Sequence, residues 1–229
     1  MKVMAIMAHP DDAEVWAGGT LAKFTHMGHQ AHIVVMTYEP HHLRGREAME
    51  GARRLGCSVD LLGLPDTGVR DTDEPANRLV EILGSQVPQI LILHNPDDTH
   101  PDHEASFLVA RRALIRWYAG GSRPGIIPSI FAANTYRGMG LRGPVELDTF
   151  VDISDVWDKK AHALMAHRSQ SPEAWIPRQK AMLEVLGARF GYRMAEGFRR
   201  LVLFSEPGSL PHLDPSLLFP AALPGAKKA

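Results

Sequence analysis

The sequence predicts an α/β fold: a single domain with a mostly parallel, twisted, Rossmann-like sheet and helices on both of its faces. Apolar segments of strand length alternate along the chain with segments of helical periodicity. Each connection between apolar segments is long enough for a helix, which is the βαβ arrangement of a parallel sheet. Hydrophobic residues make up 45% of the 229 residues, so the chain can bury a sizeable core.

Six segments are predicted as strands. The first, "KVMAIMA", is a continuous apolar run, the second is rich in β-branched residues, and "PQILIL" is the clearest buried strand. In chain order, the predicted strands are residues 2–8, 31–37, 58–64, 88–93, 129–136 and 147–153.

Six segments are predicted as helices. Gly28 and Gly56 end the first two, because glycine commonly follows the last helical residue. Pro101 suits the first position of the fourth helix, and Asp102 and Glu104 complement the positive end of its dipole. In chain order, the predicted helices are residues 16–28, 44–56, 75–86, 101–120, 154–168 and 173–190.

Composition limits the partners and the compartment. The 25 basic and 26 acidic residues nearly cancel, which argues against nucleic acid or an anionic membrane as the main partner. No apolar run approaches the roughly 20 residues of a membrane-spanning helix, and the N-terminal run is too short for a signal peptide. Cys57 is the single cysteine and has no partner for an internal disulfide. We therefore expect a cytoplasmic protein.

The chain is expected to consist of a domain over residues 1–205 and a proline-rich tail over residues 206–229. The tail holds five of the 17 prolines and ends in Ala-Lys-Lys-Ala. Two interpretations stay open: an extended arm that docks on the body or on a neighbour, and a partly disordered tail.

Two loops rich in His and Asp suggest a metal site. "HPDDAE" (9–14) follows the first predicted strand, and "HNPDDTHPDH" (94–103) follows "PQILIL". If these strands are close neighbours, both loops meet at the carboxyl edge of the sheet, where ligand sites gather. His and Asp are the ligand types of a catalytic zinc ion that keeps one position open to water.

The spacing within each loop fits such a site. His9 and Asp12 lie three residues apart, so a turn can aim both side chains at one point while Asp11 points elsewhere. His100 and His103 have the same spacing at a helix start, where they can share a face. A lone His-Pro-Asp-Asp is also an ordinary turn sequence. Two such loops, each directly after a buried strand, favour the metal site over the turn.

Four motifs occur together in the chain: "AHPDDAE", "GGTLA" at 18–22, "HPDH" at 100–103 and "HRSQ" at 167–170. With these motifs the chain resembles the LmbE-like family, the PIG-L type of zinc-dependent N-deacetylases that act on N-acetylglucosamine-containing compounds. Weaker similarities are "RGRE", "LGLPD" and "AEGFR". The order and spacing of these motifs cover residues 1–204.

The resemblance implies a metal centre and its chemistry. His9, Asp12 and His103 are then the metal ligands, with Zn²⁺ as the expected ion and Fe²⁺ or Mn²⁺ as alternatives. Asp11 is the general base, and His100 stabilises the oxyanion or assists protonation of the leaving group.

The resemblance also implies substrate contacts. Arg44 and Asp66 align with positions that contact substrate in the family. The "HRSQ" motif is expected to support the site without a specified role. Two neighbouring acids, Asp97 and Asp98, are left open between holding a site histidine and forming a turn.

Two other features are expected to have no catalytic or ligand-binding role. His41 and His42 are expected to be a solvated pair, although contact with substrate is an alternative. Trp16 is expected to pack under the first helix rather than against a ligand.

The implied function is hydrolysis: removal of an acetyl group from an N-acetylglucosamine-type amino sugar or glycoconjugate. Alternatives are an amidase that cleaves a thiol or sugar conjugate at the same centre, and a non-catalytic sugar-binding protein. A nucleotide-binding Rossmann protein is disfavoured, because no glycine-rich phosphate loop follows the first strand. The expected partner is a small amino-sugar substrate, and the resemblance and the tail lead us to expect a homo-oligomer.

Overall fold

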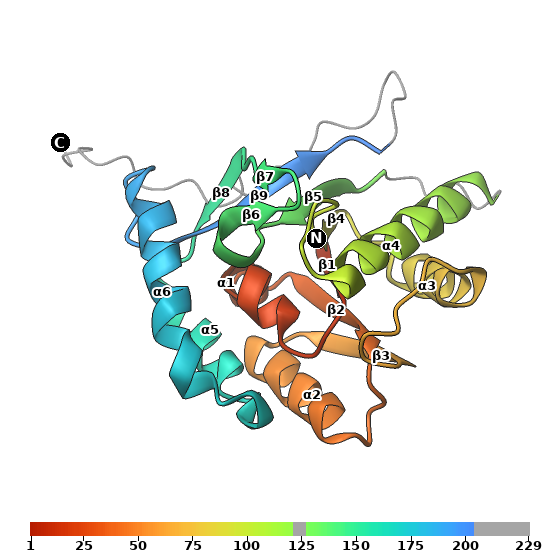
Figure 1. The fold of residues 1–229 in the computed structure, drawn as a ribbon, viewed down its shortest axis with the longest axis horizontal. Helices are drawn as coiled ribbons and strands as arrows, with labels where there is room; N and C mark the ends of the chain where they lie inside the picture. The colour runs from red at the N-terminus through yellow and green to blue at the C-terminus, as the bar shows by residue number, and fades with distance from the viewer. Residues whose placement is uncertain (121–126, 204–229) are drawn as a thin grey trace.

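A seven-stranded sheet with the order β3-β2-β1-β4-β5-β9-β8 runs through the computed structural model, which describes residues 1–120 and 127–203 (Figure 1). The first five strands in this order are parallel, and β9 is antiparallel to both of its neighbours. The predicted mostly parallel sheet is therefore confirmed. The strands are β1 (Lys2–Met7), β2 (Gln30–Thr37), β3 (Ser58–Leu64), β4 (Ile90–Leu93), β5 (Ser129–Ala133), β8 (Thr149–Asp152) and β9 (Ala195–Leu201).

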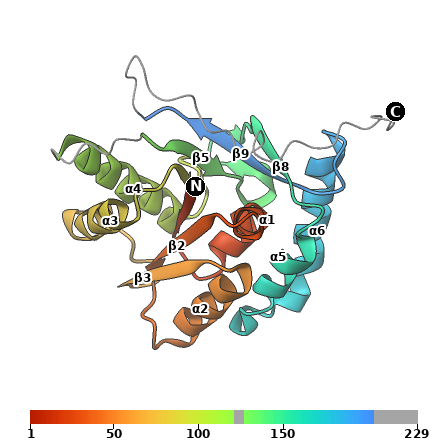
Figure 2. The ribbon, with the colours of Figure 1, turned by 180° about the vertical axis from the view of Figure 1, so that it is seen from behind.

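Helices cover both faces of the sheet, as predicted. Figures 1 and 2 show α3 and α4 on one face and α1, α2, α5 and α6 on the other. Alternate residues of β1 face the two layers: Val3 and Ala5 join the core under α1, whereas Met4 and Ile6 join the core under α3 and α4. Burial on both faces explains why this strand is a continuous apolar run. The helices are α1 (Asp12–His26), α2 (Leu43–Leu55), α3 (Asp73–Gln86), α4 (Pro101–Ala119), α5 (Trp157–Leu164) and α6 (Pro172–Ala188).

Three elements differ from the sequence prediction. Helix α1 begins at Asp12 instead of residue 16, so "HPD" (9–11) forms a turn that leads directly into the helix, with Asp11 as its N-cap. Strand β9 was not predicted, because a glycine and two arginines interrupt its apolar pattern. The predicted helix 154–168 divides into α5 and the short 3₁₀ helix η2 (Arg168–Gln170).

Three further predictions concern membrane-spanning helices, the single cysteine and the C-terminal tail. Among the described residues, no helix has the length and apolarity needed to cross a membrane. Cys57 is buried, and burial raises the pKa of its thiol to about 12. The tail predicted over residues 206–229 lies outside the described residues.

A buried ion pair fixes the middle of α1. Lys160 Nζ lies 2.6 Å from Glu196 Oε1 and also donates to the carbonyl of Val15 at 2.7 Å. The Glu196 carboxylate accepts the backbone N–H groups of Gly19 and Thr20, each at 2.8 Å. Both charged side chains are at most 1% exposed. The pair ties α5 and β9 to the helix whose first turn carries Asp12.

Replacing Lys160 by Met is expected to lower the free energy of unfolding by about 3–5 kcal/mol, because the Glu196 charge would stay buried without its partner. Denaturation in urea, followed by circular dichroism, measures the change. Lys180→Met is the matched control. Its pair with Glu184 spans 3.8 Å and is exposed, so a loss below about 1 kcal/mol is expected. Equal losses in the two variants would show that the buried pair contributes no more to the free energy of unfolding than the exposed pair does.

Candidate metal centre and active site

The pairing of β1 with β4 brings the two His/Asp loops together. The strands are parallel neighbours, with Ile6 beside Leu93, so His9 and His94 leave the sheet at the same edge. The loop after β1 leads into α1, and the loop after β4 leads into α4. The expectation that both polar loops meet at one edge of the sheet agrees with this arrangement.

The carboxylate of Asp12 lies between two histidines. Its Oδ2 is 3.3 Å from His9 Nδ1 and 3.4 Å from His103 Nε2, and all three residues are buried. His103 Nε2 is buried and makes no hydrogen bond. Two ligand atoms about 2.0–2.1 Å from a tetrahedral zinc ion are about 3.4 Å apart, so these separations fit a shared ion. Three ligand atoms also lie within 4.8 Å of one another in two groups here, Asp12 with His94 and His103, and His9 with His100 and His103, so the cluster could hold a divalent metal.

The second ring nitrogen of each histidine faces a buried carboxylate. His103 Nδ1 lies 3.0 Å from Asp98 Oδ2, and His9 Nε2 lies 3.2 Å from Asp102 Oδ2. Metal-binding histidines commonly donate their other N–H to such a carboxylate, which fixes the ring and its tautomer. Of the interpretations left open for Asp98, holding a histidine is the one that the structure favours. Asp102 contacts a site histidine as well as starting α4.

Electrostatics at this cluster follow from burial and close ion pairs. Burial opposes the charge on Asp12, but charged His103 and the contact with His9 hold the pKa of its carboxyl well below the usual range. Burial likewise opposes the charge on His103, but Asp12 and Asp98 raise the pKa of its ring to about 10. A bound metal ion would take the place of that proton, because imidazole binds metals as the neutral ring.

His94 is a fourth histidine at the centre that sequence reasoning did not single out. Its Nε2 lies 3.2 Å from Asp12 Oδ2 and accepts the backbone N–H of Ala8 at 2.9 Å. The ring is fully buried and stacks on His103 with centroids 3.8 Å apart. The bond from Ala8 occupies the lone pair that a metal would need, which argues against His94 as a ligand. Its position as the first polar residue after β4 was the available signal.

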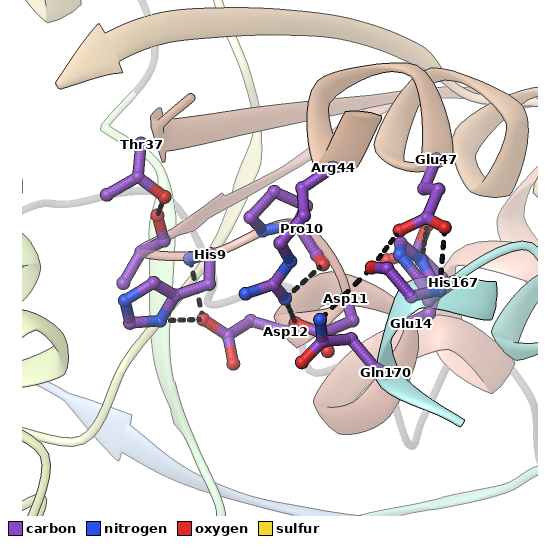
Figure 3. A network of polar contacts seen from close by, with 12 residues as sticks. His9, Pro10, Asp11, Asp12, Glu14, Thr37, Arg44, Glu47, His167 and Gln170 are labelled. Atoms are coloured by element: carbon purple, nitrogen blue, oxygen red, sulfur yellow. Dashed lines mark hydrogen bonds and ion pairs between the residues drawn. The ribbon is translucent and has the colours of Figure 1, made fainter. Parts of the chain in front are cut away.

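Asp11 is held beside the centre in an unusual backbone conformation (Figure 3). Its φ of 136° lies in a region that non-glycine residues rarely adopt, at a cost on the order of 1–3 kcal/mol. Its Oδ1 lies 3.1 Å from Arg44 Nη2. Burial and the neighbouring Asp12 raise the pKa of the Asp11 carboxyl to about 7, despite the opposing effect of Arg44. This carboxyl is suited to exchange protons near neutral pH.

His100 caps α4 and lies against the other site histidines. Its Nδ1 accepts the backbone N–H of Asp102 at 3.2 Å, so the proton of the neutral ring lies on Nε2. The ring centroid is 4.8 Å from that of His9 and 4.6 Å from that of His103. His100 can therefore donate a hydrogen bond from Nε2 into the site.

The two residues expected to contact substrate have partners within the protein. Arg44 pairs with Asp11, and its guanidinium lies over the ring of Tyr38 at 5.3 Å. Asp66 accepts a hydrogen bond of 2.6 Å from the Tyr38 hydroxyl, and its other oxygen is 3.3 Å from His9 Nε2. Both thus lie at the site, on the side of Asp11 and His9.

The "HRSQ" motif forms η2 and is anchored to α2. Ser169 donates to the Glu47 carboxylate through its backbone N–H at 2.8 Å and its hydroxyl at 2.6 Å. Gln170 Nε2 donates to Ser169 Oγ at 3.0 Å, and buried His167 Nε2 lies 3.5 Å from Glu14 Oε1 (Figure 3). The network fixes η2 beside the start of α1.

A cavity of about 470 Å³ opens over the start of α1; we name it the active-site cavity. Its lining residues are Asp11, Asp12, Val15, Trp16, Tyr136, Arg137, Gln170, Trp175, Arg178, Gln179 and Met182. Trp16 also packs in the core, as expected, whereas His41 and His42 are exposed. The four residues from α6 were missed, although their spacing of three, four and seven places them on one helix face.

The fold and the cluster define an α/β protein with a His/Asp metal site at the carboxyl edge of a parallel sheet. The family described as PIG-L, GlcNAc-PI de-N-acetylase, matches residues 4–114. Diacetylchitobiose deacetylase of Thermococcus kodakarensis is 28% identical, over 93% of this chain and 86% of that protein. 4-Oxalmesaconate hydratase of Pseudomonas putida is 26% identical, over 74% of each chain.

The chain is also similar to a solved structure. N,N'-diacetylchitobiose deacetylase from Pyrococcus horikoshii aligns with a TM-score of 0.73 and 27% identity, over 87% of this chain and 83% of that one. The chain is thus similar to PIG-L (LmbE-like) proteins in sequence and in fold.

Asp98→Asn is expected to weaken zinc binding about 10- to 100-fold, because the amide no longer accepts the His103 ring N–H as a carboxylate does. Competition with a chromophoric chelator measures the affinity. Asp97→Asn is the adjacent control. The Asp97 carboxylate accepts the backbone N–H of Arg142 at 3.2 Å and touches no site histidine in the described part of the chain. A tenfold loss in both variants, or in neither, would contradict the assigned contact.

Proposed function

We propose that the protein is a metal-dependent hydrolase that removes an acetyl group from an N-acetylglucosamine-type amino sugar or glycoconjugate. The observation that carries the proposal is the juxtaposition of Asp11 and Asp12. Asp12 lies between His9 and His103 as a metal ligand would, and Asp11, with a pKa of about 7, faces the same cavity. The two relatives named as diacetylchitobiose deacetylases support the substrate class.

The metal in this proposal is zinc, held by His9, Asp12 and His103, with Fe²⁺ and Mn²⁺ as alternatives. When bound, such an ion lowers the pKa of a coordinated water and polarises the carbonyl of the amide. The His/Asp/His donor set leaves positions open for water and substrate, as catalytic sites require. His94 remains a neutral neighbour, because burial lowers the pKa of its ring to about 4.

The chain's own residues handle the protons and the developing charge. Asp11 takes a proton from the attacking water, and its pairing with Arg44 keeps Oδ1 oriented. His100 donates from Nε2 to the oxygen that becomes negatively charged as the acetamide carbon turns tetrahedral. When the C–N bond breaks, Asp11 returns the proton to the departing amine. Acetate and a free amino sugar are the products.

A second candidate function is hydration of a carbon–carbon double bond. It is favoured by the similarity to 4-oxalmesaconate hydratase over 74% of each chain. An activated water and a carboxylate base also serve that reaction, in which a proton is delivered to carbon and no acetate is released. Amide cleavage of a thiol or sugar conjugate uses the residues assigned here and differs only in the acyl group. A non-catalytic sugar-binding protein would not need Asp11 in its strained conformation.

We also propose a cellular location and an oligomeric state. A cytoplasmic location accords with the single, buried Cys57. A homo-oligomer is proposed from the resemblance and the tail. Sedimentation of the purified protein tests the second of these proposals.

Asp11→Asn is expected to lower turnover by about 10²–10⁴ while the metal stays bound, because the amide cannot accept the proton. Asparagine has nearly the same size and shape as aspartate, so the substitution changes the packing at this position least. Acetate release from N-acetylglucosamine and its glycosides, measured with zinc-loaded protein beside metal analysis, provides the test.

Asp12→Asn is the comparison, since it should lose both metal and activity. Full activity of Asp11→Asn with one metal per chain would refute the assignment of the base. No acetate from any amino sugar, together with hydration of an unsaturated polycarboxylate, would replace the deacetylase proposal by the hydratase.

A further inference from the structure

Tyr38 lies at the carboxyl edge of the sheet, directly after β2, and belongs to none of the motifs that predict the site. Its backbone N–H donates to the carbonyl of Leu64 at the end of β3 at 3.0 Å. The preceding Thr37 donates its backbone N–H to the carbonyl of Ala8 at 3.0 Å, directly before His9. The fold thus holds Tyr38 between the loops that follow β1 and β3.

The backbone of Tyr38 adopts a conformation that a bulky side chain disfavours. Its φ is 64°, in the left-handed region, which costs about 1–2 kcal/mol for a residue with a Cβ. The chain that follows is closely packed, because a Cβ on Gly45 would collide with the Glu39 carbonyl and one on Gly63 with the Glu39 carboxylate. Residues held in such strained conformations by their surroundings cluster at functional sites.

The hydroxyl of Tyr38 directs the carboxylate of Asp66. It donates to Asp66 Oδ2 at 2.6 Å, and the backbone N–H of Thr67 donates to Oδ1 at 2.9 Å. With both oxygens bonded, the carboxylate is oriented so that Oδ1 lies 3.3 Å from His9 Nε2. A carboxylate at this ring nitrogen favours the tautomer that leaves Nδ1, which faces Asp12, free for a metal ion.

The ring of Tyr38 supports Arg44. The guanidinium carbon lies 5.3 Å from the ring centroid, and a cation in this position is attracted to the aromatic face. Nη2 of the same guanidinium is 3.1 Å from Asp11 Oδ1. His42 packs against the ring with centroids 4.7 Å apart, and its Nδ1 accepts the backbone N–H of Arg44. The ring and His42 therefore hold the arginine that pairs with Asp11.

We propose that Tyr38 is a positioning residue for both parts of the active site: its hydroxyl holds Asp66 against His9, and its ring holds Arg44 against Asp11. The two contacts use different parts of one side chain, so substitutions can separate them. The first contact concerns metal binding and does not depend on the reaction. The effect of the second on turnover rests on the proposed hydrolase function.

Tyr38→Phe removes the hydroxyl and keeps the ring. Zinc affinity, measured by competition with a chromophoric chelator, is expected to fall about tenfold, the lower end of the range for partners behind a metal ligand. Turnover at saturating zinc, measured as acetate release from glycosides of N-acetylglucosamine, should stay close to the wild-type value, because Arg44 keeps its support. Tyr192→Phe, between α6 and β9, is the control and should keep the wild-type zinc affinity.

Tyr38→Leu removes the ring as well as the hydroxyl. Its zinc affinity should match that of Tyr38→Phe, whereas turnover at saturating zinc should fall about tenfold or more, because Arg44 no longer orients Asp11. Restoration of turnover by phenylalanine but not by leucine distinguishes support by the ring from a general loss of stability. A crystal structure of Tyr38→Leu, in which the Arg44–Asp11 pair is expected to be broken, tests the second contact without reference to the reaction.

A double-mutant cycle tests whether Tyr38 acts on the metal through Asp66. Tyr38→Phe combined with Asp66→Ala should weaken zinc binding no more than Asp66→Ala alone, because both changes remove the same contact with His9. Additive losses, or an unchanged zinc affinity in Tyr38→Phe, would overturn the role of the hydroxyl. An intact Arg44–Asp11 pair in Tyr38→Leu would overturn the role of the ring.

Failure of this inference differs from failure of the proposed function. The wild-type protein might release no acetate while the variants show the expected zinc affinities and the broken Arg44–Asp11 pair. That result would support the positioning role of Tyr38 and refute the deacetylase proposal. Acetate release by the wild-type protein, with wild-type zinc affinity and an intact Arg44–Asp11 pair in Tyr38→Leu, would refute only the positioning role.

Discussion

Parallel pairing of β1 with β4 is the constraint on which the site depends. It places the ends of two buried strands side by side, so the loops that follow them emerge at one edge of the sheet. Each loop then starts a helix, and Asp12 and His103 lie in the first turns of α1 and α4. The proposed metal site, which joins His9 and Asp12 to the distant His103, depends on this one neighbour relation between strands. The buried Lys160–Glu196 pair separately fixes the middle of α1, the helix that carries Asp12.

The sequence predicted the parts of the protein whose signals are local. Apolar runs buried on both faces marked β1, β2 and β4, and their polar continuations marked the His/Asp loops. The three proposed ligands could be predicted from the sequence because they directly follow such runs or lie at the start of a helix. The partners of those ligands were harder to predict. Asp98 and Asp102 resemble turn and helix-start residues until the fold brings their carboxylates to His103 and His9.

Other features depend on contacts that a sequence pattern does not contain. The positive φ of Asp11 arises where a loop enters α1. The residue type does not predict this conformation, because aspartate is also common in ordinary turns. Strand β9 is antiparallel and partly charged, so its pairing with β5 and β8 outweighs a weak strand pattern. The α6 wall of the cavity has helical spacing, but only the tertiary structure places that face over α1. The α6 side of the cavity therefore stayed unpredicted, whereas the candidate metal ligands and the contacts expected of Arg44 and Asp66 were named from the sequence.

The most direct test of the account is the position of the metal. Anomalous diffraction at the zinc absorption edge, from crystals of zinc-loaded protein, locates the ion without reference to activity. The account predicts one strong peak about 2.0–2.2 Å from side-chain atoms of His9, Asp12 and His103, with His94 outside the coordination shell. A peak held instead by Asp66 and Asp102, or one that includes His94 in place of His9, would contradict it.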